Sequence, residues 1–172
     1  MKNKLIQVVA ATLAAIVVAA LGYVLFFRAS DEDRIRQKLT ALEGAVKSGA
    51  SASEIAARPL RIQQAFARIF TPRVRVDIPE LEEGDRPRED LAKLVASSEG
   101  RIHGLDAAFS RVHLEIDPRA QPPRADVDAL ATLKGTSRGD GMRRSNVYQV
   151  TLHFEEIEEE WRISRIAAAR VP

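Results

Sequence analysis

Few side chains in this sequence have types and positions suited to acid–base chemistry. The candidates are Asp77, His103, Asp106 and Tyr148. A general base must reach its substrate with a pKa tuned by burial or by a charged neighbour. His103 and Asp106 are expected on the link after a helix, Asp77 ends a short strand, and Tyr148 falls on the apolar face of a longer strand. A surface or core role is favoured for each, so no catalytic residue is assigned.

Metal and cofactor chemistry has little support. The chain has no cysteine, which excludes disulfides, thiolate nucleophiles and thiolate metal sites. A zinc site needs several converging ligands. Instead, His113 with Glu115, and His153 on another strand, lie on polar faces. The stretch Gly135 to Gly141 lacks the order of a phosphate-binding loop and is interpreted as a turn. We therefore expect no metal and no cofactor.

The charge balance gives no sign of a nucleic-acid-binding face. The 172 residues include 26 Lys and Arg against 24 Asp and Glu, a formal charge of +2. Lys2 and Lys4 account for that excess, so the rest of the chain is neutral. A phosphate-binding surface would require clustered basic residues. The length allows one domain of ordinary size with an appendage.

An apolar segment from Leu5 to Phe27 contains no charged residue. As a helix with about 1.5 Å rise per residue it would extend roughly 34 Å, enough to cross a hydrocarbon core of about 30 Å. A cleaved signal peptide is the main alternative, but Tyr23 to Phe27 prolong the apolar run beyond the small residues of a cleavage site. We predict an uncleaved anchor in residues 1–29 and a folded domain in residues 30–172.

The flanking charges leave the orientation of this anchor open. Basic residues lie on both sides of it, and acidic residues count little in the positive-inside rule. A very short N-terminal tail is nevertheless typical of an anchor whose N-terminus stays in the cytoplasm. We expect a single-pass protein of the cell inner membrane with its soluble domain on the periplasmic side.

Helix-forming patterns come first in the domain. Ser30 and Asp33 resemble a capping box that opens the first helix. Pro59 resets a second helical stretch, which ends before Pro72. Pro87 suits the first turn of a third helix. The apolar positions of these helices are Ile35, Leu39, Leu42, Val46, Ile62, Phe66, Ile69, Phe70, Leu91, Leu94 and Val95.

Strand-forming patterns follow. Val74, Val76 and Ile78 alternate with polar residues in a short strand, which a polar loop, Glu80 to Arg86, separates from the third helix. Longer strands are expected at Ala108 to Asp117, Ala125 to Thr136, Asn146 to Phe154 and Trp161 to Val171. Helices early and strands late indicate an α+β domain, in which a curved and mostly antiparallel sheet packs on three helices.

The last two strands are expected to form an antiparallel hairpin around the acidic link Glu155 to Glu160. In the expected register Phe154 faces Trp161, which places large cross-strand pairs on one side of the sheet. The alternation then slips, so we expect a bulge near Ser164 and Arg165.

This succession resembles the nuclear transport factor 2-like superfamily, including its SnoaL-like and ketosteroid isomerase-like members, whose fold is a cone of three helices and a curved sheet. The matching stretches are Ala67 to Val76, Gly84 to Leu91, and Tyr148 to Ile166 with Trp161. The likeness covers nearly all of residues 31–171. Its motifs are patterns, so it implies the fold far more than an activity.

The resemblance implies a pocket between the sheet and the helices. Its expected lining is Phe66, Phe70, Tyr148, Leu152 and Trp161. In enzymatic members, carboxylates, histidine or tyrosine in the pocket perform acid–base work. The tyrosine and paired aspartates of ketosteroid isomerases cannot be matched here, nor can an Asp-Arg-Asp epoxide hydrolase set. The resemblance also implies a homodimer through the outer face of the sheet.

Three functional hypotheses follow. The preferred one is a membrane-anchored, non-catalytic binding or scaffold domain for a protein partner or small apolar ligand, similar in layout to inner-membrane scaffold subunits of type IV secretion. The second is a SnoaL-like isomerase, cyclase or hydrolase. The third is a secreted soluble binding domain, which requires signal cleavage. An enclosed cavity with two or more buried ionisable groups facing each other would favour the enzyme, whereas a cavity filled by Phe66, Phe70, Leu152 and similar side chains would favour the scaffold.

The uncleaved anchor predicts the mass of the mature protein. Protein extracted from membranes is expected to have the mass of the whole 172-residue chain, because the apolar run extends past any small-residue cleavage site. Intact-mass spectrometry measures this directly. A mass lacking the first two dozen or so residues would replace the anchor with a signal peptide.

Overall fold

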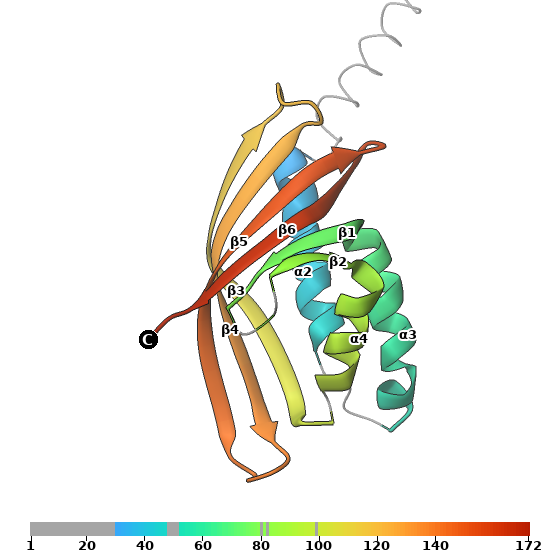
Figure 1. Cartoon of the computed structure of the whole chain (residues 1–172), viewed down its shortest axis with the longest axis vertical. Helices are drawn as coiled ribbons and strands as arrows, with labels where there is room; N and C mark the ends of the chain where they lie inside the picture. The colour runs from blue at the N-terminus through green and yellow to red at the C-terminus, as the bar shows by residue number, and fades with distance from the viewer. Residues whose placement is uncertain (1–29, 48–51, 80, 82, 99) are drawn as a thin grey trace, which may run out of the picture. The chain divides into compact units, whose positions relative to one another are not determined.

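The computed structural model describes residues 30–47, 52–79, 81, 83–98 and 100–172 (Figure 1). Its elements are α2 (Asp31–Val46), α3 (Ala52–Ile69), β1 (Phe70–Asp77), β2 (Gly84–Pro87), α4 (Arg88–Ser98), β3 (Ile102–Asp117), β4 (Arg124–Ser137), β5 (Arg143–Ile157) and β6 (Glu160–Arg170). The anchor predicted from Leu5 to Phe27 lies outside the described residues. None of the helices in the described ranges is both long enough and apolar enough to span a membrane.

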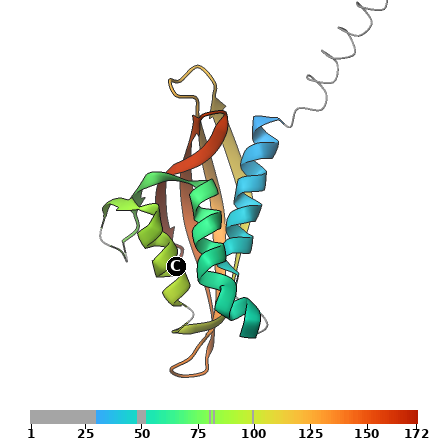
Figure 2. The ribbon, with the colours of Figure 1, turned by 90° about the vertical axis from the view of Figure 1, so that its right-hand side faces the viewer.

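The chain divides into two compact units, Met1–Arg34 and Ile35–Pro172, and the larger contains the sheet. Six strands form one curved sheet in the order β2-β1-β6-β5-β4-β3. All neighbouring strands are antiparallel except β1 and β6, which are parallel. Within this unit, helices cover one face of the sheet (Figure 2). Within the described residues, the predicted α+β class, with three helices and a curved, mostly antiparallel sheet, is therefore confirmed.

The first helix begins at the predicted capping box. Asp33 N donates to Ser30 Oγ at 3.1 Å, and Ser30 N donates in return to Asp33 Oδ2 at 3.3 Å. Asp31, Glu32 and Asp33 place three acidic side chains in the first turn. Negative charge there interacts favourably with the positive end of the helix dipole.

Arginine side chains donate hydrogen bonds to backbone carbonyls near the C-terminal ends of two helices. The guanidinium of Arg58 is only 1% exposed, and its Nη2 donates to the Val46 carbonyl of α2 at 2.8 Å. Arg88 Nη1 donates to the Ala67 carbonyl near the end of α3 at 3.2 Å. Because the last carbonyls of a helix have no partner within the helix, a cationic donor satisfies them and complements the dipole.

Pro59 does not reset the second helix, as the sequence predicted. It lies inside the continuous helix α3, where it removes one backbone donor. The side chains of Ile62, Phe66 and Ile69 are all buried further along α3. Their packing against the core outweighs the local cost of the proline, so the helix continues.

Phe70 and Pro72 belong to β1 and not to a helix and its end. Proline cannot donate to a strand ladder, and it is tolerated where pairing is irregular. The register of β1 with β6 shifts between Phe70 and Arg75, so Pro72 falls in such a place. Pro72, which was expected to follow the end of a helix, therefore lies in a strand at a place where the pairing with β6 is interrupted.

The segment before α4 contains a strand where a polar loop was expected. β2 pairs antiparallel with β1, from Val76 opposite Gly84 to Arg73 opposite Pro87. Pro87 therefore ends a strand, and α4 begins at the next residue. Gly, Asp, Arg and Pro have little strand propensity, so only the tertiary pairing with β1 specifies this strand. Leu94, expected on the buried side of α4, is 48% exposed.

The closing hairpin is antiparallel and contains the predicted bulge, but its register differs from the expectation. Phe154 pairs with Ile163, and Trp161 pairs with Glu156. The acidic link is mostly strand, because the turn consists only of Glu158 and Glu159, with φ of 52° and 62°. Positive φ at both positions is typical of the tight turns that suit strand twist. The short turn moves the register by two residues.

The buried guanidinium of Arg58 predicts a large stability effect. Arg58→Ala is expected to lower the free energy of unfolding by about 3 kcal/mol. The substitution creates a cavity and removes the guanidinium that donates a hydrogen bond to the Val46 carbonyl at the end of α2. The control Arg61→Ala removes an exposed side chain of the same helix and should change the free energy of unfolding by less than about 0.5 kcal/mol. Denaturation followed by the fluorescence of Trp161, the single tryptophan, measures both. Equal effects would contradict this account.

Candidate ligand-binding cavity

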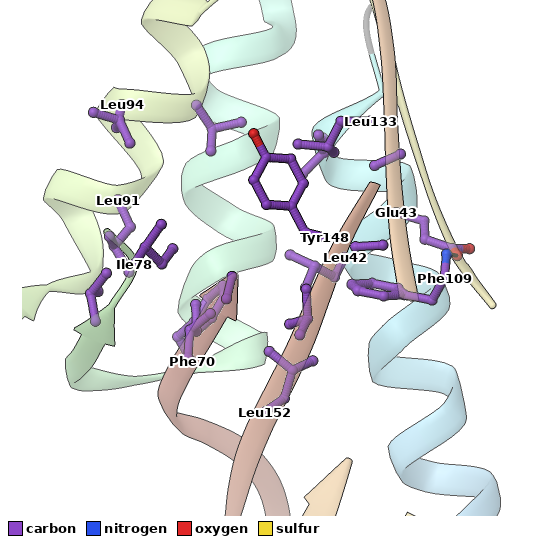
Figure 3. A pocket seen from close by; sticks show the side chains of 18 of the residues that line it. Leu42, Glu43, Phe70, Ile78, Leu91, Leu94, Phe109, Leu133, Tyr148 and Leu152 are labelled. Atoms are coloured by element: carbon purple, nitrogen blue, oxygen red, sulfur yellow. Dashed lines mark hydrogen bonds between the residues drawn. The ribbon is translucent and has the colours of Figure 1, made fainter. Parts of the chain in front are cut away.

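A cavity of about 340 Å³ lies between the helices and the inner face of the sheet (Figure 3). The side chains that the structure describes along it are apolar except for the carboxylate of Glu43 and the hydroxyl of Tyr148. The lining residues are Leu42, Glu43, Val46, Phe66, Phe70, Val76, Ile78, Leu81, Leu91, Leu94, Val95, Ala107, Ala108, Phe109, Ala131, Leu133, Tyr148, Val150, Leu152, Ile166 and Ala168.

Small side chains on the strands leave this space open. Ala107 of β3, Ala131 of β4 and Ala168 of β6 stand where larger residues would fill the interior. Protein interiors normally pack with few voids larger than a water molecule. A cavity of this size, walled by alanines on three strands, is therefore a feature of the sequence.

Two aromatic rings pack against each other in the wall of the cavity. The rings of Phe66 and Phe70 have centroids 4.8 Å apart and are tilted by 55°. This arrangement is favourable for aromatic pairs. Both rings are almost fully buried, so they form a rigid wall where α3 leads into β1.

Glu43 is held in place by the backbone of the edge strand. Phe109 N donates to Glu43 Oε1 at 2.5 Å. β3 is the last strand of the sheet, and the donor groups on its free side have no neighbouring strand. The hydrogen bond thus satisfies one of these donors and fastens α2 to the rim of the cavity.

Tyr148 projects from β5 into the cavity (Figure 3). The alternation of β5 places it on the inner face with Val150 and Leu152. Among the described residues, none hydrogen-bonds its hydroxyl. A phenol can both donate and accept a hydrogen bond. It is therefore the polar group best placed to orient a bound molecule.

Four of the five residues expected to line the pocket do so: Phe66, Phe70, Tyr148 and Leu152. Trp161 is 1% exposed but is not part of the lining. It packs in the hydrophobic core. In the observed register it pairs with Glu156, two residues along β5 from Phe154, its expected partner.

The other candidate acid–base residues lie elsewhere. His103 and Asp106 belong to β3, which begins at Ile102 and not near Ala108, and both are exposed. Asp77 accepts a hydrogen bond from Arg165 Nε at 2.6 Å, so it serves the pairing of β1 with β6. None of the three lines the cavity.

The candidate histidines are also apart from one another. His113 Nε2 contacts Glu115 Oε1 at 3.2 Å, and His153 Nδ1 contacts Asp126 Oδ1 at 2.5 Å. Each contact joins exposed or half-exposed groups on the strands.

Sequence analysis missed Glu43 and the alanines. Glu43 lies next to the apolar position Leu42, but an acidic residue beside a helical stripe usually faces solvent. Alanine gives no strong signal in a strand pattern, so the sequence did not indicate that Ala131 and Ala168 would line a space. Only the three-dimensional register brings these residues together.

Comparisons with known proteins place the fold. No family model matches the sequence, and no curated protein matches it. A nuclear transport factor 2-like superfamily protein from Salmonella enterica shares 12% identity, covering 80% of this chain and 89% of that one, with a TM-score of 0.61.

Two further structures carry names of enzymes. A hexachlorocyclohexane dehydrochlorinase from Novosphingobium barchaimii shares 12% identity over 83% of this chain and 88% of that one, with a TM-score of 0.60. A protein from Streptomyces avermitilis, named as a candidate dehydratase of the nuclear transport factor 2-like family, shares 14% identity over 83% and 97%, with a TM-score of 0.62. At these identities the likeness shows the fold, and that part of the expected resemblance is confirmed.

The contact between Glu43 and the edge strand can be tested. Glu43→Ala is expected to lower the free energy of unfolding by about 1–2 kcal/mol and to speed hydrogen exchange at the Phe109 amide, because that donor loses its acceptor. Glu43→Gln keeps a side-chain acceptor and serves as the control, with a smaller change in both. If the two variants exchange equally fast at Phe109, the contact is not what protects that amide.

Proposed function

We propose that this domain binds a small, largely apolar molecule in the cavity. The observation that carries the proposal is a lining in which the described residues provide only two polar side-chain groups, one of them a tyrosine hydroxyl that no described residue engages. The volume of about 340 Å³ lies in the usual range of ligand sites, about 300–1,000 Å³. Apolar walls provide affinity, and one or two polar groups provide orientation.

A binding role fits the cavity better than general acid–base catalysis. The enzyme hypothesis requires buried ionisable groups that face each other. In the described lining these are one carboxylate, already held by the Phe109 amide, and one phenol. His103 and Asp106, the expected acid–base candidates, lie outside the lining. Ligand binding requires no further group.

The second candidate is a SnoaL-like enzyme. The names of two structural neighbours, a dehydrochlorinase and a candidate dehydratase, favour it over a protein scaffold. In this case Glu43 would act as the base and Tyr148 as the acid. Chloride release from hexachlorocyclohexane, abolished by Tyr148→Phe and by Glu43→Gln, would support the enzyme. Absence of turnover in a preparation that binds an apolar probe would favour simple binding.

The predicted anchor completes the proposal. A single apolar helix would keep the domain beside a membrane, where apolar molecules partition. Tethering raises the effective concentration of a domain for neighbours on the same surface. The periplasmic side and a protein partner remain expectations from the sequence.

Two adjacent alanines of β6 provide a matched test of the cavity. Ala168 lines it, whereas Ala169 points away and is exposed. N-phenyl-1-naphthylamine is a neutral apolar fluorophore that accepts excitation energy from tryptophan, and Trp161 is the single tryptophan. We expect saturable energy transfer in the full-length protein kept soluble with a non-ionic amphipol. Ala168→Phe should weaken binding at least about tenfold by occupying the space.

Ala169→Phe adds the same ring outside the cavity and should leave binding unchanged. Denaturation followed by Trp161 fluorescence checks that both variants fold. Equal loss in the two variants, or no saturable transfer in the unmodified protein, would contradict binding in this cavity.

A further inference from the structure

A second pocket adjoins the apolar cavity. It has a volume of about 330 Å³ and shares Leu133 and Tyr148 with the first cavity. Its other lining residues are Arg101, Ile102, Leu105, Lys134, Gly135, Ser137, Arg144 and Asn146. Tyr148 therefore stands at the junction of an apolar chamber and a second chamber whose lining mixes apolar, polar and basic residues.

Among the described residues that line it, the second pocket has basic side chains and no acidic ones. Arg144 is partly neutralised, because its Nη2 lies 2.5 Å from Asp140 Oδ2. The Met142 backbone N–H, followed by Ser137 and Arg144, lowers the pKa of Asp140 to about 2. Asp140 is therefore ionised at neutral pH and offsets only one of these positive charges.

Arg101 is the cation best able to receive a ligand. Its side chain is exposed, and in the described part of the chain it forms no ion pair. Its carbonyl accepts a hydrogen bond from Arg138 N at 2.9 Å, which ties Arg101 to the hairpin between β4 and β5. Arg170 adds positive charge at the same wall, donating from Nη2 to Asn146 Oδ1 at 2.9 Å.

The charges of the two pockets favour one orientation of a ligand that has an apolar end and a negative end. Glu43 places a carboxylate in the first cavity, among apolar side chains. A negative group on a ligand would be repelled there and would lose its hydration. The same group near Arg101 would remain partly in water and gain a charge-assisted hydrogen bond.

From these observations we propose that the ligand is a single-chain amphiphile with a terminal carboxylate, such as a fatty acid. Its apolar chain occupies the first cavity, and its carboxylate lies near Arg101 in the second pocket, with Tyr148 alongside. Guanidinium groups match the geometry of a carboxylate. This inference rests on the proposed binding of an apolar molecule and specifies the chemistry of its polar end.

The test compares two competitors of equal chain length. Decanoate below its micellar concentration and decanol below its solubility limit are each used to displace N-phenyl-1-naphthylamine from the full-length protein in non-ionic amphipol. We expect decanoate to compete about fivefold better at low salt. That advantage should shrink at high salt, while decanol competition is unchanged, because salt screens only the charged contact.

Variants identify the cation responsible. Arg101→Gln should remove the advantage of decanoate and leave decanol competition unchanged, and Arg101→Lys should restore part of it. Arg143→Gln is the control, because Arg143 neighbours Arg144 in sequence but does not line either pocket. It should retain the full advantage.

The failures of the two proposals are distinguishable. If the probe binds and decanol competes as well as decanoate, the carboxylate proposal is wrong and apolar binding stands. The same conclusion follows if Arg101→Gln and Arg143→Gln behave alike. If the probe does not bind at all, the proposed function fails and this inference fails with it.

Discussion

The pairing of β5 with β6 decides which side chains face the helices. A turn of only two residues, Glu158 and Glu159, fixes the register of the two strands. The bulge opposite His153 and Phe154 then restores the alternation, so Ile166 and Ala168 point inward. A shift by one residue would reverse every side chain on a strand. The existence of the cavity thus depends on this hairpin.

The polarity of the interior links the fold to the proposed function. On the inner face of the sheet, alanines line the apolar cavity, and Tyr148 lies where this cavity meets the pocket with basic residues. Glu43 is occupied by the edge strand, and the basic side chains gather beyond Tyr148. Apolar walls that lead to a basic rim suit a molecule with one apolar and one anionic end. The same fold in other proteins accommodates other chemistry, so these side chains and not the fold indicate the ligand.

The sequence predicted the long strands and the order of elements because alternation and helical spacing are local signals. It did not predict β2, whose residues form a strand only through pairing with β1. Pro59 was misjudged because its local cost is outweighed by packing further along α3. Four pocket residues were expected because the family resemblance implies a pocket between the sheet and the helices. Glu43 and Arg101 have no local sequence signal that would place them at it. The site is assembled by register, which a local pattern does not determine.

The most direct test of the central claim is to identify what the protein itself retains. Full-length protein purified in non-ionic amphipol is extracted with organic solvent, and the extract is analysed by mass spectrometry beside an identical preparation of Ala168→Phe. The account predicts a single-chain amphiphile in near-stoichiometric amount that is strongly depleted in the variant. An extract with the same apolar content from both proteins would show that the cavity does not hold it.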